Sequence, residues 1–176
     1  MYSNSWHIVY GRDVCTDNFG DIYVFDPLDK ICKYNSNLVF IKEWGRDGTS
    51  NSGFIDGRSI VADANNFIYG LERFNPRLVI FDLNGNIDSI IYDTNLAAPY
   101  SYHLNLTKNQ DLIFDSGGSV LILNPTTKTH YSIFNLSTNE GGYIQSPDFS
   151  FALSDWSDRI YAYSKITQKI YVFKKI

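Results

Sequence analysis

The chain has 176 residues, of which 44% are hydrophobic and 19% charged, so it falls in the range of globular proteins with enough residues for one core. Its formal net charge of −4 argues against a surface that binds a phosphate backbone, because such surfaces cluster Lys and Arg. The aromatic share is 16%, with 13 Tyr and 12 Phe, which favours strands throughout the chain. An all-β fold is therefore expected.

Targeting signals and disulfides are not expected. No segment of the chain as given has the composition of a signal peptide or the roughly 20 apolar residues of a membrane helix, which predicts a soluble, cytoplasmic protein. The two cysteines, Cys15 and Cys32, fall on expected strands separated by a third strand, so their Cα atoms should lie about 9–10 Å apart. We interpret both as reduced, small apolar side chains.

Four copies of one unit follow each other along the chain. Residues 13–26 (DVCTDNFGDIYVFD) align without a gap with 59–72 (SIVADANNFIYGLE), and less closely with 103–116 and 151–164. The equivalent positions Ile22, Ile68, Leu112 and Ile160 are spaced by 46, 44 and 48 residues.

Within each unit the expected elements come in the same order. A first strand (12–16, 58–62, 102–106, 150–154) ends at a residue whose side chain can cap the next turn: Asp17, Asp63, Thr107 or Asp155. An apolar second strand follows (22–25, 67–71, 111–114, 159–163), then a polar turn and a third strand (30–34, 77–81, 119–123, 169–173). Fourth strands are expected at 38–44, 87–92 and 130–135, and the last unit has none.

Sheets of four short strands, repeated with a period in the forties and apolar on both faces of the second strand, are typical of β-propeller blades. The sequence predicts one domain over 1–176, with blade units at about 11–56, 57–100, 101–148, and 149–176 together with 1–10. In this scheme Ser5–Tyr10 supplies the missing strand of the last blade and closes the ring. A closed ring predicts a monomer, and an open ring predicts a dimer.

The first unit and the crossing that follows it, 44–63 (WGRDGTSNSGFIDGRSIVAD), resemble the NHL repeat. The residues in register with the repeat pattern are Asp17, Gly20, Ile22, Tyr23, Val24, Asp26, Trp44, Gly45, Gly48, Gly53, Phe54 and Asp63. The pattern departs at Gly11 and Gly57, where Pro is usual, and at Gly70, where a β-branched residue is usual. This resemblance implies a propeller, usually of six blades. Relatives of the family bind proteins or single-stranded RNA, or act as zinc-dependent lyases.

In a propeller, the turns between second and third strands lie on the same face as the entries to the first strands, around the mouth of the central channel. We call this the strand-entry face. The candidate binding residues expected there are Arg12, Arg58, Tyr102, His103, Asp26, Glu72, Arg73 and Asp115. Arg12 and Arg58 occupy equivalent positions and together can clamp a carboxylate or phosphate. The alternative interpretation is that each arginine pairs with a nearby carboxylate, Asp26, Glu72 or Asp56.

No catalytic set or metal site is expected. The three histidines, His7, His103 and His130, lack the spacing of zinc ligands, and no cofactor motif occurs. The sequence therefore favours a non-enzymatic binding or scaffold propeller that presents its strand-entry face to a protein or peptide. The alternatives are an enzyme or small-ligand binder at the channel mouth, related in kind to lyases or hydrolases, and a protein that binds single-stranded RNA.

Overall fold

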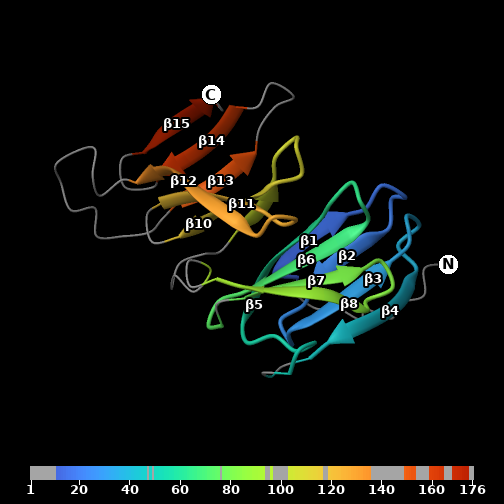
Figure 1. Ribbon diagram of the computed structural model, residues 1–176. Helices are drawn as coiled ribbons and strands as arrows, with labels where there is room; N and C mark the ends of the chain where they lie inside the picture. The colour runs from blue at the N-terminus through green and yellow to red at the C-terminus, as the bar shows by residue number, and fades with distance from the viewer. Residues whose placement is uncertain are drawn as a thin grey trace. The chain divides into compact units, whose positions relative to one another are not determined.

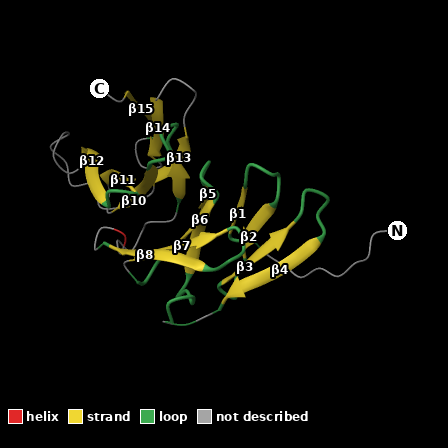
Figure 2. Cartoon of the chain, turned by 45° about the vertical axis from the view of Figure 1, so that its right-hand side comes forward, coloured by secondary structure: helices red, strands yellow, loops and turns green. Residues whose placement is uncertain are grey.

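The computed structural model describes residues 11–46, 48, 50–75, 77–93, 96, 103–116, 119–135, 149–153, 159–164 and 168–174, and these residues form strands joined by turns (Figures 1 and 2). The first two sheets contain β1 (Asp13–Thr16), β2 (Ile22–Phe25), β3 (Lys30–Tyr34), β4 (Phe40–Gly45), β5 (Gly57–Ala62), β6 (Phe67–Glu72), β7 (Arg77–Asp82) and β8 (Ile87–Tyr92). The other strands are β9 (Leu104–Leu106), β10 (Leu112–Ser116), β11 (Ser119–Asn124), β12 (Thr129–Asn135), β13 (Phe149–Leu153), β14 (Arg159–Ser164) and β15 (Lys169–Lys174).

The strands form antiparallel sheets in which sequence neighbours pair. The orders are β1-β2-β3-β4, β5-β6-β7-β8 and β9-β10-β11-β12, and a three-stranded sheet has the order β13-β14-β15. The predicted repeat is thus confirmed in the described residues as three four-stranded meanders and one three-stranded meander. Residues 1–10, which the sequence assigns to a closing strand, lie outside the described residues, so ring closure stays a prediction.

The first turns of the first three units are built in the same way, as the capping residues predicted, and the turn at Asp155 lies outside the described residues. Asp17 and Asp63 each accept hydrogen bonds from two backbone N–H groups of their own turn through Oδ1, at 2.8–3.0 Å. Thr107 Oγ1 accepts one such bond, from Asp111 N at 3.0 Å. The equivalent last residues of these turns have left-handed backbones: Gly20 (φ 82), Asn66 (φ 70) and Gln110 (φ 65).

A tyrosine six residues after the capping aspartate completes this turn in the first two units. Tyr23 Oη donates to Asp17 Oδ2 at 2.8 Å, and Tyr69 Oη donates to Asp63 Oδ2 at 2.9 Å. Asp17 and Asp63 are buried, so the tyrosines satisfy carboxylate oxygens that water does not reach. The bond therefore ties the second strand to the turn before it.

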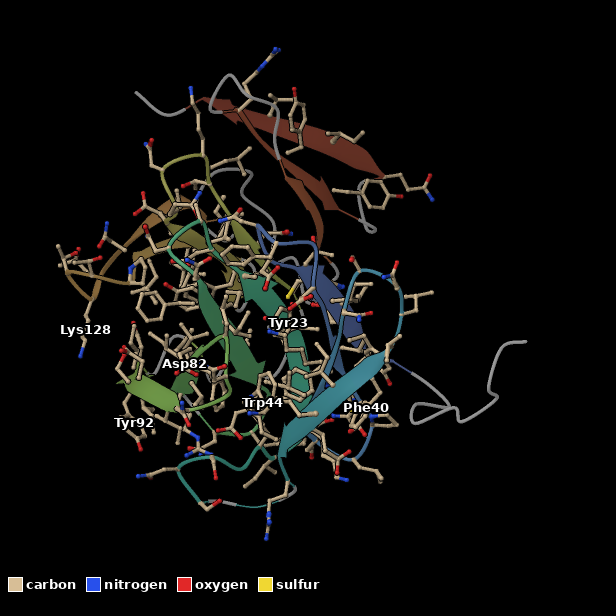
Figure 3. All side chains as sticks on the ribbon, turned by 90° about the vertical axis from the view of Figure 1, so that its right-hand side faces the viewer. Tyr23, Phe40, Trp44, Asp82, Tyr92 and Lys128 are labelled. Atoms are coloured by element: carbon tan, nitrogen blue, oxygen red, sulfur yellow. The ribbon has the colours of Figure 1, made fainter. Side chains whose placement is uncertain are left out.

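The chain divides into two compact units, each larger than one sequence repeat. The first compact unit is Met1–Glu72 with Val79–Ile90, and the second is Arg73–Leu78 with Ile91–Ile176. The terms first unit and second unit refer to these two compact units from here on. In the first unit, the first two sheets pack against each other around Phe54, whose ring centroid lies 4.8 Å from that of Phe25 and 5.9 Å from that of Phe81. Trp44 of β4 lies beside this core, 6.0 Å from Tyr23 and 6.1 Å from Phe81 between ring centroids (Figure 3). Trp44 is thus a packing residue.

Two departures from the NHL pattern are explained by this core. A Cβ on Gly70 would lie 2.8 Å from Phe54 Cζ, and one on Gly57 would lie 2.1 Å from Phe25 Cε1. Both contacts are shorter than packed carbon atoms allow. Glycine at these positions makes room for the two phenyl rings.

Candidate functional site

The strand-entry face of the first unit is held by Arg12, which precedes β1. Arg12 Nη1 donates to Asp29 Oδ1 at 2.9 Å and to the carbonyl of Gly57 at 2.7 Å, and Nη2 donates to the carbonyl of Pro27 at 3.2 Å. Asp56 Oδ1 lies 3.1 Å from Nη1 and is the fourth oxygen around the guanidinium. The guanidinium therefore joins the β2–β3 turn of one sheet to the entry of the first strand of the next.

Arg58, at the equivalent position in the second sheet, joins the same cluster. Its Nη2 lies 2.6 Å from Asp56 Oδ2, so Asp56 binds Arg12 through one oxygen and Arg58 through the other. The two arginine side chains are 25% and 28% exposed. Sharing of Asp56 by both arginines is the pairing that the alternative interpretation of the sequence describes.

Asp29 lies at the centre of this cluster, and the sequence did not point to it. Besides Arg12, it accepts hydrogen bonds from the backbone N–H groups of Gly57 at 2.8 Å and Asp56 at 3.1 Å. It is 6% exposed, and its left-handed backbone (φ 60) turns the side chain toward the next sheet. The only sequence signal was an Asp at the end of the β2–β3 turn, a position where Asp also occurs for purely local reasons.

Two other predicted carboxylates, Asp26 and Glu72, accept hydrogen bonds from backbone N–H groups. Asp26 Oδ1 accepts from Leu28 N at 2.8 Å and from Lys30 N at 2.9 Å, which caps its own turn. Glu72 is fully buried and accepts from Ile55 N at 2.6 Å. Both residues therefore shape the strand-entry face by fixing its turns.

A second link between the two sheets runs through Asp13 of β1. Asp13 Oδ2 accepts hydrogen bonds from Ser59 Oγ and from Ile60 N, the latter at 2.9 Å. Ser59 is fully buried. The serine is the donor in this pair, and the contact supports the cluster by holding β5 against β1.

The remaining predicted residues belong to the second unit or lie outside the described residues. Arg73 Cζ lies 4.9 Å from the ring centroid of Phe74, and the phenyl ring is 63% exposed. His103 is exposed. Asp115 belongs to β10, where only its backbone is described, and Tyr102 is not among the described residues. Of the predicted set, the structure joins Arg12 and Arg58 through Asp56, whereas Asp26 and Glu72 bind backbone N–H groups of neighbouring turns.

The described residues contain no group of three or more His, Cys, Asp or Glu side chains placed to hold a metal ion. No helix among them is long and apolar enough to cross a membrane. Cys15 and Cys32 are free thiols, as predicted, and burial, assisted by Asp26, raises the pKa of Cys32 to about 11.

Comparison with solved structures identifies the fold as a β-propeller. A virginiamycin B lyase from Staphylococcus aureus is 13% identical with a TM-score of 0.58 and matches 93% of this chain and 55% of its own. A streptogramin B lyase is 17% identical with a TM-score of 0.58 and matches 92% of this chain and 53% of its own. The WD40 β-propeller domain of Doa1 is 14% identical with a TM-score of 0.65 and matches 90% of this chain and 48% of its own.

The chain therefore spans about half the length of these structures. No protein-family model and no curated protein match the sequence. The predicted all-β propeller is confirmed as a fold, whereas four blades, ring closure and the NHL repeat type stay predictions.

Proposed function

We propose that the chain is a non-enzymatic binding propeller with NHL-like repeats, and that it presents the strand-entry face of its first unit to a protein or peptide partner. The observation that carries this proposal is the state of the two arginines. Arg12 has four internal acceptors, and Arg58 shares Asp56 with it. Both guanidinium groups are bound to acceptors within the chain, so they do not form an open site for a free anion.

The cluster instead forms a fixed surface of mixed charge. The side chain of Asp56 is 18% exposed and lies between two arginines that are themselves about one quarter exposed, so all three groups reach solvent without being mobile. Side chains already held in place lose little rotamer entropy when a partner binds. Arginine is also among the residues most often found at the energetic centre of protein interfaces.

An apolar contact lies beside these charges. Leu28, at the tip of the β2–β3 turn, is 66% exposed, although its neighbours in the turn, Asp26 and Asp29, are buried and fixed by hydrogen bonds. A leucine on a rigid turn next to a charged cluster suits a partner that offers a small apolar pocket ringed by polar groups.

Affinity capture tests the proposal. The chain, immobilised, is mixed with an extract of cells that make it, beside a variant carrying Leu28→Ser and Arg58→Ala. A matched control, Lys128→Ala, also removes one exposed cation but lies on the turn after β11. We expect the control to retain a partner that the double variant loses; equal capture by all three forms would show that this face is not the binding site.

The enzyme alternative draws on the likeness to streptogramin lyases, which at this identity concerns the fold alone. It is tested by incubation with quinupristin, the compound bound in a similar lyase structure. We expect quinupristin to be recovered unchanged. For single-stranded RNA, the net charge of −4 predicts weak binding that is lost at moderate salt.

A further inference from the structure

The β7–β8 turn holds the one asparagine of the chain that is followed by glycine, Asn84-Gly85. In such a pair, the backbone nitrogen of the glycine can attack the side-chain carbonyl carbon of the asparagine and close a five-membered ring, a succinimide. Both atoms belong to one short stretch of chain, and glycine has no Cβ to obstruct their approach. The pair therefore has the composition of a site that is modified without an enzyme.

Within this turn, Asn84 is exposed, and its side-chain amide lacks the contacts that hold the other polar groups. Asp82 Oδ1 accepts from the backbone N–H groups of Asn84 and Asn86, both at 2.8 Å, and Asp82 Oδ2 accepts from Asn86 Nδ2 at 2.8 Å. Asn18 Nδ2 is likewise bound, to the carbonyl of Ala64 at 3.1 Å. Among the described residues, the hydrogen bonds of Asn84 are made by its backbone alone, so its side-chain carbonyl carbon can rotate toward the next backbone nitrogen.

Lys42 of β4 contacts the peptide group that takes part in this reaction. Its Nζ donates a hydrogen bond to the carbonyl oxygen of Asn84. This oxygen and the nitrogen of Gly85 belong to one peptide group, so the oxygen takes up much of the negative charge when the nitrogen loses its proton. A cation held at the oxygen stabilises that anion and raises the fraction of Gly85 nitrogen that is ready to attack.

Two contacts of Gly85 restrain the reaction while the turn is closed. Its N–H donates to the carbonyl of Asp82 at 3.0 Å, and its left-handed backbone (φ 76) lies so close to Trp44 that a Cβ would be 2.5 Å from Cδ2. The turn is exposed to solvent at Asn84, so it can open locally without unfolding of the sheet. Only the bond between the Gly85 N–H and Asp82 has to break, and the contact of Lys42 with Asn84 can persist.

We infer that Asn84 is a site of deamidation and that Lys42 promotes the reaction. The lone pair of the Gly85 nitrogen forms a bond to Cγ of Asn84, the bond between Cγ and Nδ2 breaks, and ammonia leaves with the proton that the Gly85 nitrogen has lost. Water then opens the succinimide. Cleavage of the new N–Cγ bond gives aspartate, and cleavage of the original peptide bond gives isoaspartate, whose main chain runs through Cβ and Cγ. No atom is oxidised or reduced.

Isoaspartate at position 84 weakens the contact between the first two sheets. The carbonyl oxygens of Leu83 and Asn84 accept hydrogen bonds from Lys33 and Lys42 of the first sheet, the former at 3.2 Å. One extra backbone carbon moves these acceptors away from the two lysines. The modification thus converts the chain, as it ages, into a less stable form.

Ageing of the purified full chain in mildly alkaline buffer, with peptide mass spectrometry at intervals, tests the inference. We expect the peptide that contains Asn84 to gain the mass difference between an amide and a carboxylic acid, as two products of different retention time, before any other asparagine reacts. The melting temperature should fall as isoaspartate accumulates, and Asn84→Ser, which cannot form the ring, should show neither change. The chain unfolded in denaturant is the reference for the reactivity of the Asn-Gly pair. If it converts while position 84 of the folded chain stays intact, the inference is overturned.

Lys42→Met separates activation from simple support of the turn. Methionine keeps an apolar stem and removes the cation, so conversion at Asn84 should slow about threefold to tenfold in the folded chain and be unchanged in denaturant. A lysine that only held the turn closed would give the opposite result, faster conversion after its loss, so an equal or faster rate would overturn the role given to Lys42.

Lys30→Met is the matched control. It removes another cation of the same sheet, one that pairs with Glu43 near the opposite end of β3 and β4, and should leave the rate at Asn84 unchanged. Equal slowing by both lysine variants would show a general effect of charge and would also overturn the role of Lys42.

Discussion

Removal of the Asp29 carboxylate should destabilise the first unit more than an ordinary turn substitution does. In Asp29→Ala, the buried N–H of Gly57 loses its acceptor, at a cost of about 1–3 kcal/mol. The N–H of Asp56 is half-exposed, and water replaces its lost bond at little cost. Loss of the bond to the partly exposed Arg12 costs about 1 kcal/mol more.

The left-handed backbone at Asp29 adds to this, because alanine at φ 60 carries a strain of about 1–2 kcal/mol. We therefore expect a total loss of about 3–6 kcal/mol in the free energy of unfolding. Asp29→Asn is the matched control. It keeps one acceptor oxygen and tolerates the left-handed backbone, so it should lose about half as much.

The assay is unfolding in denaturant, followed by the fluorescence of Trp44 in a variant that lacks the other two tryptophans. Hydrogen exchange of the Gly57 amide measures the same effect locally, and Asp29→Ala should speed it. A loss below about 0.5 kcal/mol for Asp29→Ala, the range of ordinary surface substitutions, would refute the central position given to this residue. Equal losses for the Ala and Asn variants would refute the assignment of the cost to missing acceptors and strain.

Three further outcomes are expected. Gly70→Val should destabilise the chain by about 1–3 kcal/mol through overlap with Phe54, and Phe54→Leu should recover part of that loss in a double-mutant cycle; additive losses would contradict the overlap. Burial, together with a neighbouring aspartate, raises the pKa values of Tyr23 and Tyr69 above 10.0, so the unfolded chain ionises first and the free energy of unfolding should fall as pH rises above that value. Substitution of both tyrosines by Phe should flatten this alkaline fall, and an unchanged curve would count against it. The pKa of Cys32, raised from 9.0 to about 11, should slow its alkylation near pH 8 about a hundredfold relative to the unfolded chain, measured by mass spectrometry; native-state labelling at the unfolded rate would disprove its burial.

The sequence predicted those features that local chemistry repeats. β2 and β3 begin and end at the predicted residues, because a short apolar run between an Asp-led turn and a polar turn is typical of a strand. The caps at Asp17, Asp63 and Thr107 were predicted for the same reason. The fourth strand of the first unit begins at Phe40 and not at residue 38, because the left-handed backbone of Leu38 keeps it in the turn.

The long-range contacts of the candidate site were harder to predict. Asp26 and Asp29 lie three residues apart in one turn, yet Asp26 caps that turn while Asp29 reaches the entry of the next sheet. Periodicity does not separate these roles, because they depend on how two sheets pack. Because Arg12 and Arg58 are equivalent in the repeat, the sequence predicted both arginines on one face. Their common contact with Asp56 depends on the geometry of the crossing before β5, which the repeat does not specify.

Site-specific photo-crosslinking tests whether the strand-entry face of the first unit binds a protein or peptide partner. A photoreactive residue replaces Leu28 in one form of the chain and Lys128 in another, and both are irradiated in cells that make the protein. We expect a crosslinked partner at position 28 that is absent at position 128 and is lost when Arg58→Ala is added. Crosslinks at both positions alike, or at neither, would contradict it.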